Sequence, residues 1–207
     1  AGEEALHKCM ENVGGFYHND QTFRLITQLE HRYAEFDGLN LTWETLEGIA
    51  KHNGPLMGPH ADIKKHGDGI TESIAEVDAI WPLGLDGFAG LEAQVAALAD
   101  DIAYTAHDLD DGLRGGYLQL EDLLDLPLVG PVLQEVRSKW PTLEPRRQRH
   151  EMNRRLINIL CADVLAETRR RLDEKKPQSV DDVHGAGMPF VQFSDRLRKD
   201  ERVVRKY

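Results

Sequence analysis

The residues of this sequence with the clearest capacity for chemistry lie in one acidic stretch, residues 91–113, LEAQVAALADDIAYTAHDLDDGL. The stretch contains six acids and neither Lys nor Arg: Glu92, Asp100, Asp101, Asp108, Asp110 and Asp111. Carboxylate oxygens are the ligands that Mg²⁺ and Mn²⁺ prefer, and an imidazole such as that of His107 can bind transition metals. Because like charges along a helix are destabilising unless they are compensated, the stretch indicates either a solvated surface or a site for a cation.

On a helical wheel the same stretch separates into two faces. One face is apolar and comprises Leu91, Val95, Leu98, Ile102, Ala106, Leu109 and Leu113. The opposite face holds Asp100, Tyr104, His107, Asp108 and Asp111 within an arc of about 100°. A polar stripe of this kind is most often the solvated side of an amphipathic helix. A tyrosine between two acids can also support the ring of a ligand, so the residues alone leave both interpretations open.

The composition is that of an ordinary soluble globular protein, with 207 residues, 41% hydrophobic and 29% charged. The net charge of −11 argues against a general nucleic-acid coat, although it leaves room for a local basic pocket. Only Cys9 and Cys161 are present, too few for a disulfide framework, which indicates a reduced, cytoplasmic setting. No apolar run has the length of a membrane span and no signal peptide opens the chain, so we expect no membrane association.

Helical periodicity predominates along the chain, and strand or hairpin signals are scarce. The patterns predict helices near residues 20–36, 42–52, 70–80, 91–113, 128–140 and 145–176, followed by a loop from 177 to 193 and a terminal helix. Thr42 is the expected N-cap of the second helix, and Leu41 and Leu46 have the spacing of a hydrophobic staple. The sequence therefore predicts a single all-α domain over residues 1–207, with residues 177–207 forming the loop and last helix.

The two ends of the sequence, AGEEALHKCM and DERVVRKY, both read as parts of amphipathic helices without start or stop signals. We therefore expect the chain to be a piece of a longer protein. Within it, His60 and His66 lie in a polar loop, have no usual zinc spacing and lack nearby cysteines, which indicates a flexible surface loop rather than a metal site.

Three ordered motifs resemble those of one family. The segment ADDIAYTAHDLDDGL resembles the late motif of the deoxyguanosine triphosphate triphosphohydrolases, a branch of the HD-domain phosphohydrolase superfamily. GLNLTWETLEGIAKHNGPL and GGFYHNDQTFRL are similar to two further segments of that family. The resemblance covers most of the chain, and it implies a multi-helix HD-domain-like fold that is incomplete at its N-terminus.

The resemblance also implies a divalent metal, Mg²⁺ or Mn²⁺ or another transition metal, held by an early His, a His-Asp doublet and a late Asp. Asp100 matches the late Asp, whereas the doublet belongs to a segment whose final A-G-E matches the first residues of this chain. The early His and the doublet would therefore lie before Ala1. His107-Asp108 does not replace the doublet, and the resemblance assigns no role to His107.

The implied reaction is hydrolysis of a deoxynucleoside triphosphate between O5′ and the α-phosphorus, which releases the deoxynucleoside and intact triphosphate. By position, Glu3 would orient the missing catalytic His, and His18 would face the phosphates. Tyr104 would pack on the sugar and exclude a 2′-hydroxyl, and Asp108 would bind the 3′-hydroxyl. Lys51 would contact phosphate. From the residues alone, Glu3 could equally be a solvated acid, His18 a turn residue and Lys51 a cation at a helix C-terminus.

Two other functions stay open at this stage. One is another HD-type nucleotide phosphohydrolase, such as a nucleotidase, and the other is a helical nucleotide-binding or oligomerisation module without catalysis. The resemblance also implies a homo-oligomer, for which the Arg-rich segment 145–176 could serve, and nucleic acid is expected only as an effector. For these 207 residues alone we expect no turnover, because one carboxylate cannot hold the cation.

Overall fold

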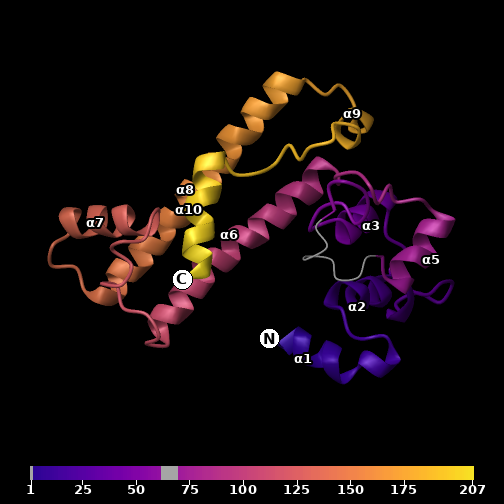
Figure 1. Ribbon diagram of the computed structural model, residues 1–207, viewed down its shortest axis with the longest axis horizontal. Helices are drawn as coiled ribbons and strands as arrows, with labels where there is room; N and C mark the ends of the chain where they lie inside the picture. The colour runs from indigo at the N-terminus through magenta and orange to yellow at the C-terminus, as the bar shows by residue number, and fades with distance from the viewer. Residues whose placement is uncertain (1, 62–69) are drawn as a thin grey trace. The chain divides into compact units, whose positions relative to one another are not determined.

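The computed structural model describes residues 2–61 and 70–207, and it confirms the all-α fold class (Figure 1). Within these residues the regular structure is helical, apart from an isolated bridge between His31 and Gly38. The contacts divide the chain into two compact units, which are described separately. Unit 1 comprises Ala1–Gln94 and Pro177–Pro189, and unit 2 comprises Val95–Lys176 and Phe190–Tyr207.

Unit 1 is built from short helices around a small apolar core. Its helices are α1 (Gly2–Cys9), the 3₁₀ turn η1 (Glu11–Val13), α2 (His18–Arg24), the π-helical turn η2 (Leu25–Leu29), α3 (Trp43–Ala50), α5 (Glu72–Ile80) and α9 (Val180–His184). Thr42 occupies the N-cap of α3 as predicted. The buried core consists of Phe23, Leu46, Ala50, Leu56, Ile74, Leu83 and Leu85, and Leu41 packs against it from one side.

The helix predicted over residues 20–36 ends earlier, at Leu29. Beyond it the chain turns back, and Gly38 has a φ of 75°. A Cβ at Gly38 would collide with the carbonyl of Thr27, so the turn requires glycine at this close approach. Tyr33, which extended the apolar spacing of the predicted helix, is 55% exposed. The apolar spacing that extended the predicted helix therefore included residues that do not share a buried face.

Unit 2 contains the longer helices. They are α6 (Leu91–Arg114), whose first four residues belong to unit 1, α7 (Val129–Lys139), α8 (Pro145–Lys175) and α10 (Asp195–Lys206). The predicted apolar stripe of α8 is confirmed, because Met152, Leu156 and Leu160 are completely buried. Ile102 and Leu109 of α6 join the same core, as their place on the apolar face predicted. Helical periodicity thus located the buried faces of α8 and of α6 from Leu98 onward, whereas Val95, which the wheel placed on the same apolar face of α6, is 52% exposed.

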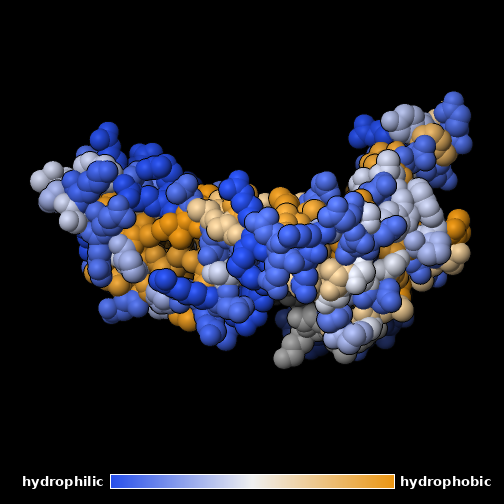
Figure 2. Space-filling view, turned by 90° about the horizontal axis from the view of Figure 1, so that it is seen from above, coloured by the Kyte–Doolittle hydropathy of each residue, from blue (hydrophilic) through white to orange (hydrophobic). Residues whose placement is uncertain are grey.

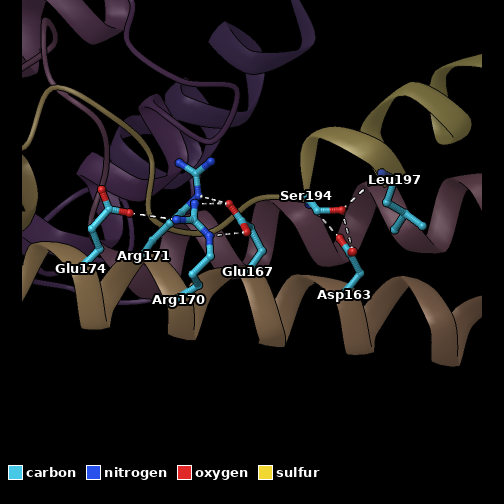
Figure 3. A network of polar contacts seen from close by, with 7 residues as sticks. All are labelled: Asp163, Glu167, Arg170, Arg171, Glu174, Ser194 and Leu197. Carbon is cyan, nitrogen blue, oxygen red and sulfur yellow. Dashed lines mark hydrogen bonds and ion pairs between the residues drawn. The ribbon is translucent and has the colours of Figure 1, made fainter.

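The start of α10 is fixed to α8 by a capping arrangement (Figure 3). The Ser194 hydroxyl accepts a hydrogen bond from the Leu197 N–H at 3.3 Å and donates one to the Asp163 carboxylate at 2.7 Å. The other oxygen of Asp163 accepts the Ser194 N–H at 2.8 Å. The N-cap is therefore held by a side chain from another helix in addition to its own hydrogen bond.

Near its C-terminal end, α8 carries a group of alternating charges, also drawn in Figure 3. Glu167 accepts hydrogen bonds from Arg170 at 2.8 Å and from Arg171 at 2.7 Å, and Arg170 also reaches Glu174 at 2.8 Å. The hydrogen bonds from Arg170, and next those from Arg171, outweigh the opposing effect of partial burial and lower the pKa of Glu167 to about 2. These arginines are thus engaged by acids of their own helix.

Hydrophilic side chains cover much of the face shown in Figure 2, with hydrophobic patches between them. Several large apolar side chains of the described residues are exposed, among them Ile80, Val13 and Leu165, at 87%, 75% and 59%. Among the described helices none combines the length and the apolar character that crossing a membrane requires.

Candidate functional site

The acids of α6 divide into those that have an arginine partner and those that have none. Ion pairs join Asp101 to Arg205, Asp110 to Arg149, and Asp111 to Arg114. The first two pairs, at 2.9 Å and 2.8 Å, use arginines of α10 and α8. Asp110 and Arg149 are both largely buried, and their contact is an ion pair rather than a well-directed hydrogen bond. The tertiary structure therefore supplies positive charge that the acidic stretch itself lacks.

Asp100, Tyr104, His107 and Asp108 form an exposed face of α6, which we call the α6 polar face. Over residues 2–61 and 70–207, none of these four side chains makes a hydrogen bond or an ion pair. Tyr104 is 57% exposed even though its ring is large and partly apolar. Unit 2 thus compensates some acids of α6 and leaves Asp100 and Asp108, on either side of Tyr104, uncompensated.

Glu3 and His18 are brought together in unit 1. One carboxylate oxygen of Glu3 lies 2.8 Å from Nδ1 of His18 and accepts the backbone N–H of His18, also at 2.8 Å. Partial burial would raise the pKa of Glu3, but the hydrogen bonds from the backbone and imidazole of His18 outweigh it and lower that pKa. With Nδ1 engaged, Nε2 of His18 is the ring nitrogen that remains to exchange a proton. The sequence analysis expected Glu3 to orient a His before Ala1 and His18 to face phosphate, and it did not predict that Glu3 and His18 contact each other.

Lys51 lies just beyond the end of α3 and is almost completely buried, with 3% of its surface exposed. Its ammonium lies 2.6 Å from the carboxylate of Glu47, which is 1% exposed. It also donates hydrogen bonds to the carbonyls of Gly84 at 2.9 Å and Phe88 at 3.4 Å. Two of its three N–H donors make these hydrogen bonds, and its contact with Glu47 is an ion pair without a hydrogen bond of good geometry. A phosphate would have to compete with these partners for a lysine that is almost completely buried.

The sequence reasoning missed Glu47 and His184, two ionisable residues of unit 1 that lie beside Lys51 or its partner. The Glu47 oxygen that faces Lys51 also lies 3.1 Å from Nε2 of His184, on α9. The i, i+4 spacing of Glu47 and Lys51 could have indicated their pair. No local pattern could have indicated His184, because it meets Glu47 only through the tertiary fold.

A pocket of about 790 Å³ lies within unit 1, between the end of α1, α2 and α5. Asp20, Arg24, Glu72 and Glu76 are among its polar lining residues, and none of the six predicted site residues lines it. Of those six, Glu3, His18 and Lys51 belong to unit 1, and Asp100, Tyr104 and Asp108 belong to unit 2.

A metal centre needs several ligands, and the described residues do not supply a complete set. In the part of the chain that the structure describes, no group of three or more His, Cys, Asp or Glu side chains could hold a metal ion. His60 lies beside Phe88, with ring centroids 5.5 Å apart, and His66 lies outside the described residues. Asp100 alone offers one hard oxygen ligand, of the type that suits Mg²⁺ or Mn²⁺.

Comparison with known proteins finds relatives that carry the name of the family that the motifs resemble. A protein named deoxyguanosinetriphosphate triphosphohydrolase-like protein from Brucella ovis is 52% identical over 207 residues, all of this chain. Proteins of the same name from Parvibaculum lavamentivorans and Cereibacter sphaeroides are 51% and 48% identical over 207 and 206 residues. The chain is homologous to the deoxyguanosinetriphosphate triphosphohydrolase-like proteins. It spans about half the length of these curated relatives, 51% of the first two and 52% of the third. No protein-family model matches the chain.

Proposed function

We propose that this chain is part of a metal-dependent deoxynucleoside triphosphate triphosphohydrolase. The proposed reaction breaks the bond between O5′ and the α-phosphorus of dGTP or another dNTP, and it releases the deoxynucleoside and triphosphate. The name of the relatives and their identity of about one half over the whole chain support this proposal. The structural observation that carries it is the α6 polar face, where Asp100, Tyr104 and Asp108 have no partner among the described residues.

The α6 polar face has the chemistry to bind a deoxyribose. The three side chains lie four residues apart, so successive ones lie about one helical turn from each other on the same face. We propose that the Tyr104 ring packs against the sugar and leaves no space for a 2′-hydroxyl. The Asp108 carboxylate is free to accept a hydrogen bond from the 3′-hydroxyl, since no arginine engages it in unit 2.

Asp100 is the proposed metal ligand of this chain. Its exposed carboxylate could coordinate a divalent cation, but the remaining ligands have to come from outside the described residues. When bound, a divalent cation would lower the pKa of a water nucleophile and polarise the α-phosphate. The neighbouring Asp101 is not a candidate, because Arg205 engages it at 2.9 Å.

Glu3 and His18 are the proposed acid–base residues. Glu3 binds Nδ1 of His18 and so fixes the orientation of the imidazole, and its lowered pKa keeps the carboxylate charged. In this role Nε2 of His18 holds or transfers a proton near the phosphates. The proposed phosphate contact of Lys51 is the least supported of the six roles, because Glu47 and two carbonyls bind its ammonium.

The test uses the intact protein with Mn²⁺ or Mg²⁺ and a panel of dNTPs, with products identified by ion-exchange chromatography and ³¹P NMR. We expect triphosphate as the phosphorus-containing product, and Asp100→Asn should abolish its release. Asp101→Asn is the matched control, because it removes the adjacent carboxylate, whose interaction in the structure is an ion pair with Arg205. This variant should keep its activity. Release of pyrophosphate or orthophosphate instead would refute the proposed cleavage site.

The chain of 207 residues provides a second test. We expect it to release no triphosphate by itself, because it supplies one metal ligand among its described residues. Measurable triphosphate release by this chain alone would show that the assignment of the metal ligands is wrong.

A further inference from the structure

His107 is the member of the α6 polar face that the proposed function leaves without a role. Its side chain is exposed, and in the part of the chain that the structure describes it makes no hydrogen bond or ion pair. A neutral imidazole offers one N–H donor, one acceptor nitrogen and a flat ring. The place of this ring relative to Tyr104 decides which part of a bound nucleotide it can reach.

Four residues surround Tyr104 on the surface of α6, because neighbours on a helix are three and four positions apart. Asp100 and Asp101 lie one turn before it, and His107 and Asp108 lie one turn after it. With about 100° of rotation per residue, Asp108 and His107 lie roughly 40° and 60° from Tyr104, to opposite sides. By the same rotation Asp101 lies on the side of Asp108, and Asp100 lies on the side of His107.

The proposed contacts fix how a deoxyribose lies on Tyr104. Its O5′ points toward Asp100, where the metal and the α-phosphate are proposed to bind, and its 3′-hydroxyl points in the opposite direction, toward Asp108. The base is attached to C1′, which is bonded to neither C3′ nor C4′, so the base leaves the sugar on a side remote from both of these groups. It therefore extends across the helix, over either Asp101 or His107.

Helix α10 covers the side of α6 on which Asp101 lies. Arg205 of α10 binds the Asp101 carboxylate at 2.9 Å. The Thr105 hydroxyl lies 3.2 Å from a carboxylate oxygen of Glu201, also on α10, and these two residues are only 4% and 5% exposed. His107 is exposed, and no hydrogen bond or ion pair joins it to another described helix. The side that remains open to a base is therefore that of His107.

We propose that His107 contacts the base of the bound deoxynucleotide and contributes to the preference among bases. This inference rests on the proposed function, because it takes the sugar contacts of Tyr104 and Asp108 as given. The imidazole can stack on the base, and its N–H can donate to an acceptor such as N7, which guanine and adenine share. His107 then acts in substrate recognition, whereas the residues that break the bond lie elsewhere.

The test compares substrates with and without a base on the intact protein, with triphosphate release as the measurement. The substrate without a base is a deoxyribose 5′-triphosphate that carries hydrogen in place of the base, so it keeps the 3′-hydroxyl and all three phosphates. His107→Ala should lower kcat/KM for the preferred dNTP by about tenfold, mainly through a higher KM. For the substrate without a base, kcat/KM should change by less than about twofold, or the inhibition constant should do so if this compound is not hydrolysed.

His150→Ala is the matched control, because His150 is also an exposed histidine on a helix of unit 2 but belongs to α8. It should leave both substrates unaffected. If His107→Ala weakens both substrates equally, or neither, the contact with the base is refuted even though the wild type releases triphosphate. A wild type that releases no triphosphate from any dNTP would instead refute the proposed function, and this inference with it.

Discussion

Replacing Lys51 by Met should destabilise unit 1 strongly. The substitution keeps the length and apolar stem of the side chain but leaves Glu47, 1% exposed, without its 2.6 Å partner. Removing one member of a buried ion pair costs about 3–5 kcal/mol. We expect a loss of about 3 kcal/mol, at the lower end of that range, because His184 at 3.1 Å and the Gly90 N–H at 3.3 Å still face the carboxylate.

The double variant Lys51→Met/Glu47→Gln should recover most of this loss. No buried charge then lacks a partner, so we expect a net destabilisation of only about 1 kcal/mol. Lys8→Met is the control, since Lys8 is exposed on α1 and its substitution should change stability by less than about 0.5 kcal/mol. The two variants together separate the cost of an uncompensated charge from the cost of losing the lysine.

Native-state hydrogen exchange of the α3 amides is the appropriate assay, because it reports the opening free energy of unit 1 and does not assume that both units unfold together. If Lys51→Met changes this free energy by less than about 1 kcal/mol, the buried ion pair does not stabilise unit 1 as the geometry requires. A rise of KM for dNTP in the intact variant, with unchanged stability, would then support the phosphate contact instead.

Three further predictions concern unit 2. Gly130→Ala should destabilise unit 2 by more than about 2 kcal/mol in thermal unfolding, because the alanine Cβ would collide with the carbonyl of Leu124. This loss is expected even though alanine favours helices more than glycine does. Unchanged stability would contradict that packing. Ser194→Ala should cost about 1 kcal/mol by the same measurement, since the cap of α10 and its bond to Asp163 are both lost, and a neutral result would show that the cap is dispensable. The pKa of Glu167 is lowered to about 2, so its contribution to stability is present above about pH 4.5 and is lost as pH falls toward 2. An NMR titration of the Glu167 carboxyl with a midpoint near 4.5 would show that its arginine partners do not engage it in solution.

The helices that follow a regular period were predictable from the sequence because helical hydrogen bonds and apolar spacing are local properties. The buried faces of α8 and of α6 from Leu98 onward came out as expected, and so did the N-cap at Thr42, but Val95 of α6 is exposed. The helix predicted over 20–36 failed at Leu29, where the close approach of Gly38 to Thr27 turns the chain back. The apolar period of the sequence does not reveal such a contact, because apolar residues in a turn can continue the helical spacing by chance.

The sequence by itself determined the helical fold class and placed Asp100, Tyr104 and Asp108 on one face of α6, since a fixed rotation per residue decides which side chains share a face. Only the tertiary structure decided which acids of that helix have partners. Asp101 and Asp110 meet arginines of α10 and α8, whereas Asp100 and Asp108 meet none among the described residues.

The same distinction holds in unit 1. The positions of Glu47 and Lys51 on successive turns were readable from their spacing, but their burial and the arrival of His184 were not. An ion pair depends on distance and on exclusion from water, and residues far apart in the chain acquire both only when the helices pack.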